Sequence, residues 1–300
     1  MCGKNPLPGS FSMQRVAYIF LASVLLLCNP VKSQDKPYMI HSVEMPSGQQ
    51  PIAYEFLRES DVVWYTELWK AIDLREAFNQ YIYFPIEQND ISGKKSLAYV
   101  IWEAVERDEI PIYEDDALQI PIDTRFFIER YTKADTVQLE IGYDDDDNEI
   151  YQTVVTQKHF DGADIVQYSL REAWFIGKQD SRQDSRRLAL APMKDIFMTL
   201  KSSREELYMG RAALFWIPMQ HPAVRRLLAK STAYIDDNNI ANQPSWDNIF
   251  IGQLYSAYVT KESNLHDRDV DQYLTGKDAL IEAALIEKKV YEIGDDMWEY

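Results

Sequence analysis

Glycine is scarce in this chain, and its scarcity limits the folds that the chain can adopt. Only 11 of the 300 residues are glycine, against a usual share of about 7%. Beyond the N-terminal segment, no two glycines lie closer together than Gly162 and Gly177. Nucleotide-binding folds that cradle phosphate in a glycine-rich loop need glycines a few residues apart. The sequence therefore excludes this whole class of fold.

The composition is that of a globular protein with an acidic surface. Hydrophobic residues make up 46% of the chain and charged residues 26%, which are ordinary values and argue against a disordered or fibrous protein. The net charge of −17 opposes binding to the phosphate backbone of nucleic acids. The same charge favours association with basic protein surfaces. We therefore expect no nucleic-acid partner and, where charge matters, a cationic protein partner.

The N-terminal segment has the pattern of a secretory signal peptide. Arg15 precedes an apolar run over residues 16–27, which is too short to span a bilayer but suits the apolar part of a signal peptide. A small residue, Ser33, stands just before Gln34. We expect cleavage between these two residues, so that residues 1–33 form the signal peptide.

Cleavage after Ser33 would remove the only two cysteines, Cys2 and Cys28, and would leave a net charge of −20. Leu27 stands before Cys28, where a lipoprotein has a small residue, so the pattern argues against lipidation. The mature chain would have no disulfide, thiolate nucleophile or cysteine metal site. Its stability would depend on the hydrophobic core, and we expect an exported protein that is soluble beyond the signal peptide.

Hydrophobic periodicity predicts both helices and strands. Apolar residues at helical spacing predict helices over 60–79, 96–107, 222–230, 245–260 and 276–291. Extended segments are predicted over 81–85 and 110–123, and strands over 136–141, 150–156, 174–176, 187–191 and 212–217. The strands over 136–141 and 150–156 would form a hairpin around the acidic stretch 144–148. The strand over 212–217 is apolar on both faces, so we expect it at the centre of a sheet.

These elements predict an α+β fold with a single mixed domain over residues 57–300. Amphipathic helices would pack on a largely antiparallel sheet. Residues 34–56 contain three prolines and no regular period, so we expect an extended arm before the domain. A two-lobed arrangement is the alternative.

No motif for catalysis or metal binding stands out in the sequence. The four histidines are at least 45 positions apart, which excludes short zinc motifs, and G-x-S-x-G is missing. The acidic stretch 144–148 lacks the glycine and the distal glutamate of a calcium-binding EF-hand. We expect no enzyme activity, no cofactor and no metal. A carbohydrate hydrolase that uses two carboxylates and a calcium-stabilised adhesin-like module are the alternatives.

Five aromatic and basic residues are the candidate partner interface. Arg225, Arg226 and Lys230 would form a basic face on the helix over 222–230, and Trp298 and Tyr300 lie at the end of the sequence. Aromatic residues and arginine are enriched at protein interfaces. Core packing is the simpler explanation for most of the aromatic residues, and a solvated face is the simpler explanation for the basic ones.

Several short blocks of sequence follow one another from about residue 58 to residue 300. They are DVVW at 61–64, LWKAIDLRE at 68–76, Asn79, YFP at 83–85, REAWF at 171–175, LAP at 190–192, LFWI at 214–217, WDNIF at 246–250, SAYV at 256–259, KESN at 261–264, DAL at 278–280 and Trp298. In these blocks the chain resembles the GldN family, also called PorN. Residues 137–160 lie outside the resemblance.

The resemblance implies a non-enzymatic subunit of the type IX secretion system of Bacteroidota. Members of the family are periplasmic and form a ring with the lipoprotein GldK (PorK) at the inner face of the outer membrane. The shaft protein GldM (PorM) couples this ring to the motor in the inner membrane. From the resemblance we expect a homo- or hetero-oligomeric ring that supports protein export and gliding motility, and no catalytic residues.

Overall fold

The structure is a computed structural model. It describes residues 50–86, 95–132, 135–143, 149–156, 159–178, 182–199, 206–235 and 243–296. The expected signal peptide with its cleavage site at Ser33 and Gln34, most of the expected arm, the acidic stretch 144–148, and the candidate interface residues Trp298 and Tyr300 lie outside the described residues.

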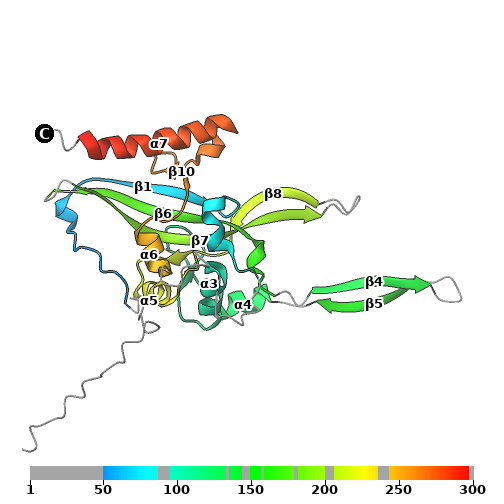
Figure 1. Cartoon of the computed structure of the whole chain (residues 1–300). Coiled ribbons are helices and arrows are strands. Elements are labelled where there is room, and N and C mark those ends of the chain that lie inside the picture. The colour runs from blue at the N-terminus through cyan, green and yellow to red at the C-terminus, as the bar shows by residue number, and fades with distance from the viewer. Residues whose placement is uncertain are drawn as a thin grey trace, which may run out of the picture. The chain divides into compact units, whose positions relative to one another are not determined.

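An antiparallel sheet forms the centre of the fold (Figure 1). Its strands run in the spatial order β10, β1, β6, β7, β8, and β9 pairs with β7 off this path. The bounds are β1 (Val62–Asp73), β6 (Ile165–Gly177), β7 (Gln183–Thr199), β8 (Glu206–Ala213), β9 (Ile217–Pro218) and β10 (Tyr258–Glu262). Neighbouring strands are antiparallel throughout this sheet.

Helices and two further hairpins complete the described structure. The α-helices are α2 (Gln80–Tyr83), α3 (Leu97–Glu106), α4 (Thr124–Tyr131), α5 (Pro222–Lys230), α6 (Trp246–Ile251) and α7 (Lys277–Asp296). Single 3-10 turns are η2 (Glu59–Asp61), η3 (Ala77–Asn79), η4 (Gly162–Asp164) and η5 (Val270–Gln272). The hairpins are β2 (Ile112–Tyr113) with β3 (Pro121–Ile122), and β4 (Asp135–Tyr143) with β5 (Glu149–Thr156). The expected α+β fold is thus confirmed.

The main hydrophobic core lies between the sheet and the layer that contains α3, α5 and α6 (Figure 1). Tyr168 and Leu170 of β6 are fully buried there, together with Trp246 of α6. Since side chains alternate between the two faces of a strand, Tyr168, Leu170 and Glu172 point to this helical face. Gln167, Ser169 and Arg171 point to the opposite face.

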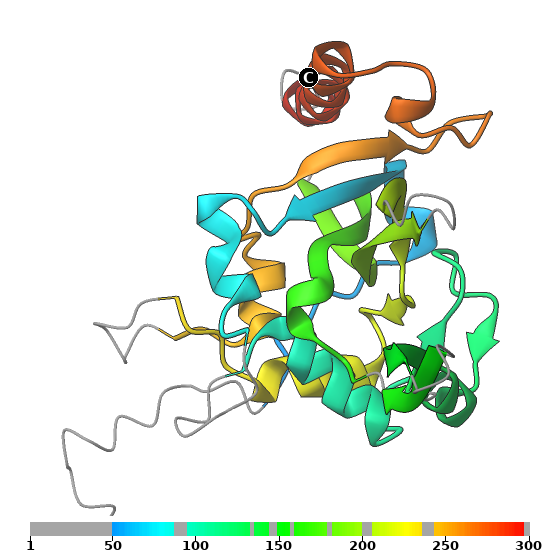
Figure 2. The same ribbon diagram turned by 90° about the vertical axis from the view of Figure 1, so that its right-hand side faces the viewer.

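Helix α7 covers the β10 edge of the sheet, as Figure 2 shows. Ala283, Ile286 and Val290 of α7 pack against Leu68 of β1 and Val259 of β10 in a second apolar cluster. This helix lies where the sequence predicts one over 276–291. Within the described part of the chain, no helix combines the length and apolar character needed to cross a membrane.

The helix predicted over 60–79 is wrong, because residues 62–73 form β1. Valine, tryptophan, tyrosine and threonine fill the first five positions of this strand, and such residues favour strands. Its charged residues meet partners on the neighbouring strand, since Glu67 pairs with Arg171 and Lys70 with Glu172. Glu67 and Lys70 are three positions apart, a spacing that a helix places on one face, but in the strand they lie on opposite faces.

Three further predictions need correction, and several are confirmed. The helix predicted over 245–260 ends at Ile251, and its last residues belong to β10. The strand predicted over 212–217 is not central, because β8 ends at Ala213 and β9 is a short strand beside β7. Residues 80–83 form α2 instead of an extended segment.

The structure confirms several other predicted elements that it describes. These are the helices over 96–107 and 222–230, the hairpin of 136–141 with 150–156, and the strands over 174–176 and 187–191.

Candidate functional site

A row of small side chains crosses the face of the sheet opposite the helical layer. Ser169 of β6 lies in register with Ala71 of β1 on one side and with Ala191 of β7 on the other. Ala71 and Ala191 are fully buried, so of this row only Ser169 borders a depression on that face. The rows on either side hold Trp69 with Arg171, and Gln167 with Met193.

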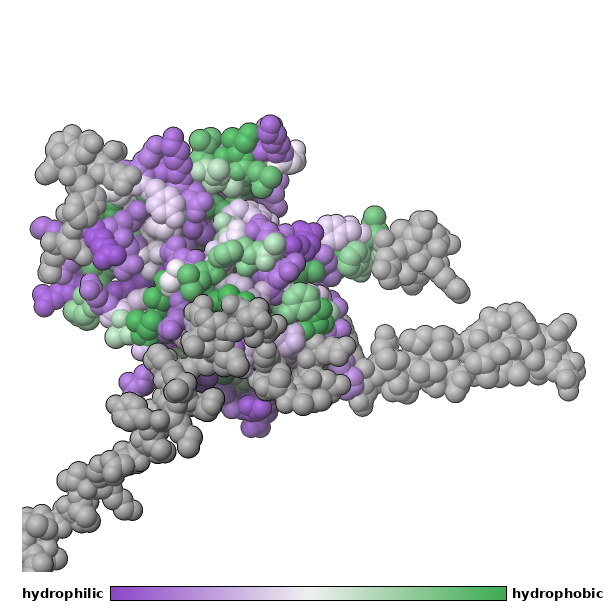
Figure 3. Space-filling model, in the orientation of Figure 1, coloured by the Kyte–Doolittle hydropathy of each residue, from purple (hydrophilic) through white to green (hydrophobic). Residues whose placement is uncertain are grey.

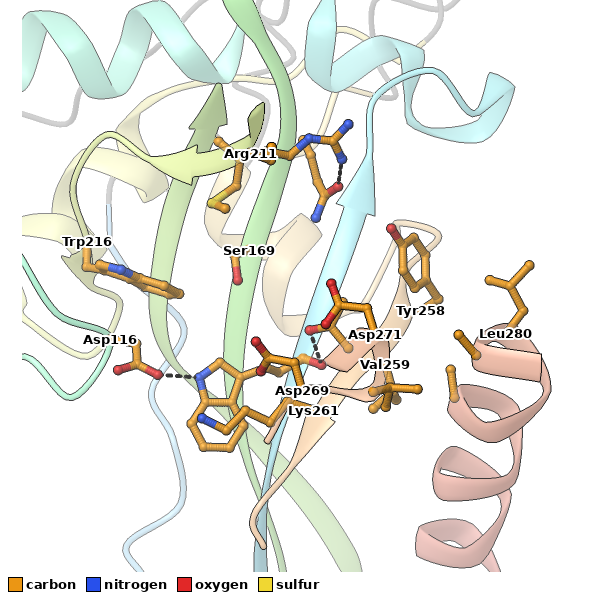
Figure 4. A pocket seen from close by; sticks show the side chains of 18 of the residues that line it. Asp116, Ser169, Arg211, Trp216, Tyr258, Val259, Lys261, Asp269, Asp271 and Leu280 are labelled. Atoms are coloured by element: carbon orange, nitrogen blue, oxygen red, sulfur yellow. Dashed lines mark hydrogen bonds between the residues drawn. The ribbon is translucent and has the colours of Figure 1, made fainter. Parts of the chain in front are cut away.

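Segments that are distant in the sequence enclose this depression and form a hollow of about 700 Å³ (Figure 4). Ser169 and Gln167 of β6 lie on its floor, and Trp69 of β1 lines it as well. Further walls come from the connection between β2 and β3, from β8 and β10, and from the region of η5 and the first turns of α7. A volume of this size is typical of sites that bind a small molecule or a few residues of a peptide.

Trp69 is a firmly held wall of the hollow. Its indole Nε1 donates a hydrogen bond of 2.7 Å to Oδ2 of Asp116, drawn as a dashed line in Figure 4. The Lys261 ammonium lies 4.4 Å from the centroid of the Trp69 ring, and the Arg171 guanidinium lies 5.4 Å from it. Arg171 in turn pairs with Glu67 at 2.5 Å. Cations are attracted to the face of an indole ring, so these contacts fix the ring in place.

Three carboxylates give the hollow a negative electrostatic potential. Asp116, Asp269 and Asp271 line it and make no ion pair with any described residue. Burial raises the pKa of Asp269; the Lys261 cation opposes this shift, and the neighbouring carboxylates, including Asp271 and Asp116, add to it. Two cations also line the hollow, but both are paired, Lys261 with Asp267 and Arg211 with Asp195.

Two polar groups on the floor of the hollow have unused hydrogen-bonding capacity. Gln167 is only 6% exposed, and its Oε1 accepts a hydrogen bond from Nη1 of Arg211. Its amide Nε2 has no acceptor among the described residues. The hydroxyl of Ser169 has no partner there either, and Figure 4 shows it at the centre of the floor. Both groups are therefore available to a bound molecule.

On the helical face of the same strands, the charged side chains are buried and paired with one another. Glu172 is fully buried, and its carboxylate lies 3.5 Å from Nζ of Lys70 and 3.4 Å from Nε of Arg187. Tyr255 donates a hydrogen bond of 2.8 Å to it, and Lys70 also bonds Glu287 of α7 at 3.1 Å. Burial lowers the pKa of Lys70, but Glu172 and Glu287 outweigh this effect and the net shift is upward. The cluster ties α7 and the segment after α6 to the sheet.

Two apolar surfaces of the described structure have no covering. On α7, Leu280, Ile281 and Leu285 are about half exposed, whereas the buried residues of the helix lie on another stripe. The outer ends of β7 and β8 carry a second set of exposed residues, and Figure 3 shows hydrophobic side chains gathered in both places. The second set consists of Ile196, Phe197, Met198, Leu207, Tyr208 and Met209, each between 47% and 56% exposed.

The predicted basic face on α5 needs correction. Arg225 is only 8% exposed, and its guanidinium bonds Asp247 at 2.7 Å and 3.1 Å and the carbonyl of Ile52 at 2.6 Å. It therefore holds α5 to α6 and takes no part in an exposed interface. Arg226 and Lys230 are exposed, as predicted. Sequence reasoning missed the hollow, because its residues come together only through the register of the strands.

The comparison with protein families identifies the chain. Residues 57–299 match the family described as gliding motility associated protein GldN. The chain belongs to the GldN family. The match spans the central sheet, the hollow and α7, and the description of the family records an association with gliding motility. No curated protein matches the chain. Among the described residues, no group of three or more histidine, cysteine, aspartate or glutamate side chains is arranged to hold a metal ion.

Proposed function

We propose that this member of the GldN family is a non-enzymatic subunit of the type IX secretion system. It works in the periplasm, where it forms a ring with a GldK-like (PorK-like) lipoprotein beneath the outer membrane. The lipoprotein holds the ring to that membrane, and a GldM-like (PorM-like) shaft protein couples it to the inner membrane. The ring supports protein export and, in gliding species, motility. The observation that carries this proposal is the family match over residues 57–299.

The uncovered apolar surfaces support a function in assembly. Helix α7 buries one apolar stripe against the sheet and leaves Leu280, Ile281 and Leu285 in solvent. Exposed apolar patches of this kind mark protein interaction sites. The outer ends of β7 and β8 form a second surface of the same character. Both patches border the hollow, since Leu280 and Tyr208 line it, so together they offer one extended contact surface to a neighbouring subunit.

The acidic charge supports a basic partner. With the net charge of −20 expected after cleavage, the mature chain attracts basic surfaces, so encounter with a basic face of the lipoprotein or the shaft would be accelerated by charge. Charges separated by more than about 8 Å are screened at physiological ionic strength. The rate of association should therefore fall as salt is added.

Mixing the purified mature chain with the soluble domain of its GldK-like lipoprotein tests the proposal. We expect a stable complex in size-exclusion chromatography at low ionic strength, and slower association at higher salt. In cells, deletion of the gene should stop export of type IX substrates, and fractionation should recover the chain with the periplasm and the outer membrane. Absence of a complex at low salt, together with normal export in the deletion strain, would refute the proposal. Turnover of a polysaccharide that a single aspartate or glutamate substitution abolishes would instead support the hydrolase.

A further inference from the structure

We propose that the hollow on the open face of the sheet binds an extended basic segment of a partner protein. A basic side chain of that segment lies among Asp116, Asp269 and Asp271, and its main chain bonds Gln167 and Ser169 on the floor. The identity of the partner rests on the proposed function, in which the partner is the GldK-like lipoprotein. The chemistry of the bound segment follows from the hollow alone.

Charge is the first argument for a basic ligand. Both cations that line the hollow already have a counterion, since Lys261 pairs with Asp267 and Arg211 with Asp195. Arg171, which lies beside the Trp69 ring, pairs with Glu67. The carboxylates of Asp116, Asp269 and Asp271 make no such pair with the described residues. The site therefore has a surplus of negative charge, inside a depression where water screens charge less than at an open surface. A lysine or arginine side chain is the complementary ligand.

The aromatic lining is the second argument. Trp69, Trp216 and Tyr258 all line the hollow, and Figure 4 shows Trp216 and Tyr258 on different sides of it. The face of an aromatic ring attracts cations, and the ring also packs against the methylene groups of a long basic side chain. Trp69 already attracts Lys261 and Arg171 in this way. The lining thus suits both the charge and the stem of a basic side chain.

The floor of the hollow is the third argument, because it points to a peptide main chain. The amide Nε2 of Gln167 is a donor on a side chain that is more than nine-tenths buried, and no described residue accepts from it. This Nε2 atom is not among the fully buried polar atoms that lack a partner, so solvent in the hollow reaches it, and a ligand that displaces this water must supply an acceptor in its place. A peptide carbonyl supplies that acceptor, and the hydroxyl of Ser169 can donate to a second carbonyl or accept from an amide. Carboxylates and donors together match a basic peptide better than they match an isolated cation.

Binding of a labelled peptide tests the inference directly. The probe is acetyl-Ala-Lys-Ala-Lys-Ala-amide with a fluorophore, titrated with the purified mature chain at low ionic strength and followed by fluorescence anisotropy. We expect saturable binding, and at least tenfold weaker binding when norleucine replaces both lysines. Failure of the lysine peptide to bind, or equal binding of the norleucine peptide, would overturn the inference.

Two variants and one matched control locate the site. The double substitution Asp269→Asn with Asp271→Asn should weaken binding at least tenfold. Ser169→Leu fills the floor without a change in charge and should weaken it to a similar extent, with circular dichroism used to verify folding. The control, Glu59→Gln with Glu129→Gln, removes two charges from exposed positions away from the hollow and should change binding less than twofold. An equal loss in the control would show general attraction to an acidic chain and would overturn the inference.

A second arm separates this inference from the proposed function. The soluble lipoprotein domain is mixed with the parent chain and with the Asp269→Asn, Asp271→Asn variant. If the parent chain binds the peptide but not the lipoprotein, the proposed function fails and the peptide site stands. If both chains bind the lipoprotein equally well and neither binds the peptide, the ring stands and the site in the hollow is refuted. Loss of both interactions in the variant alone supports the two proposals together.

Discussion

The two faces of the central sheet use charge in opposite ways. On the helical face, Glu172 is buried with Lys70 and Arg187, and each of the three side chains has a partner inside the protein. On the open face, Asp269 and Asp271 border a hollow and have no ion-pair partner among the described residues. The strands therefore supply the charge cluster that holds the fold together, whereas the carboxylates that remain available come from segments that border the open face, the β2–β3 connection and the region of η5. This contrast indicates that the open face, and not the helical face, is built for contact with another molecule.

The largest expected effect comes from removal of the central carboxylate on the helical face. Glu172→Ala leaves Lys70 and Arg187 buried without their shared counterion. A buried charge that loses its partner typically costs about 3–5 kcal/mol of folding free energy, so urea denaturation should show a loss of that order. The control is Glu67→Ala, which breaks a more exposed pair with Arg171 and should cost about 1 kcal/mol or less. Equal losses for the two variants would contradict the contrast between the faces.

The two stripes of α7 should differ in a similar way. Ile286 is 4% exposed and packs against the sheet, so Ile286→Ala should cost about 2–4 kcal/mol. Leu285 is 53% exposed, and Leu285→Ala should change the stability of the isolated chain by less than about 0.5 kcal/mol. Chemical denaturation measures both values, and co-elution with the lipoprotein should be weakened by Leu285→Ala. Unchanged complex formation would show that the outer stripe is not an interface.

Two tyrosines on the helical face provide a finer comparison. The Tyr255 hydroxyl donates to the carboxylate of Glu172, and a hydrogen bond to a charged group contributes about 1.5–3 kcal/mol. We expect Tyr255→Phe to lower the free energy of unfolding by that amount. The Tyr168 hydroxyl is buried and has no hydrogen-bond partner in the described structure, so Tyr168→Phe should leave stability unchanged or slightly raised. A loss above about 1 kcal/mol for Tyr168→Phe would reveal a partner for that hydroxyl.

The smallest effect should come from Asp269 on the open face, and it should depend on pH. Because its pKa in the folded chain is raised above the ordinary value of 3.8, proton binding stabilises the folded state. This contribution is fully present below pH 3.8 and is lost as the pH rises through the folded-state pKa. Asp269→Asn should therefore raise the Tm at pH 7 by at most about 2 °C, since solvent screens this partly exposed group.

The Tm difference between Asp269→Asn and the parent chain should disappear as the pH falls toward 4. Glu59→Gln, at an exposed position, serves as the control in the same thermal scans and should show no such trend. A lower Tm for Asp269→Asn at pH 7 would mean that the carboxylate stabilises the fold, contrary to the direction of its pKa shift.

Part of the fold could be predicted from the sequence because the signals are local. Helix α5 has proline at its first position, and its observed bounds agree with the prediction. The segment of β1 fits a helical period as well, because its second half is buried on both faces, at Leu68, Lys70, Ala71 and Ile72, and so lacks the simple alternation of a strand. Lys70 added to the error, since it is buried in the structure and a lone lysine in sequence suggests an outer face.

The hollow could not be predicted for a different reason. Ala71, Ser169 and Ala191 form one row only through the pairing of β1, β6 and β7, and the sequence contains no local signal for this register. The walls depend on equally distant contacts, such as the hydrogen bond from Trp69 to Asp116. Arg225 was misjudged on similar grounds, because its partner Asp247 lies on another helix.

Helix α7 carries apolar side chains on two stripes, and only one of them is covered. A copy that finds no assembly partner would keep Leu280, Ile281 and Leu285 in water, where such side chains promote aggregation. Cells should therefore keep the amounts of this chain and its partners in balance. Overproduction of the chain alone should lead to insoluble deposits or to degradation by proteases, and co-production of an assembly partner should relieve both.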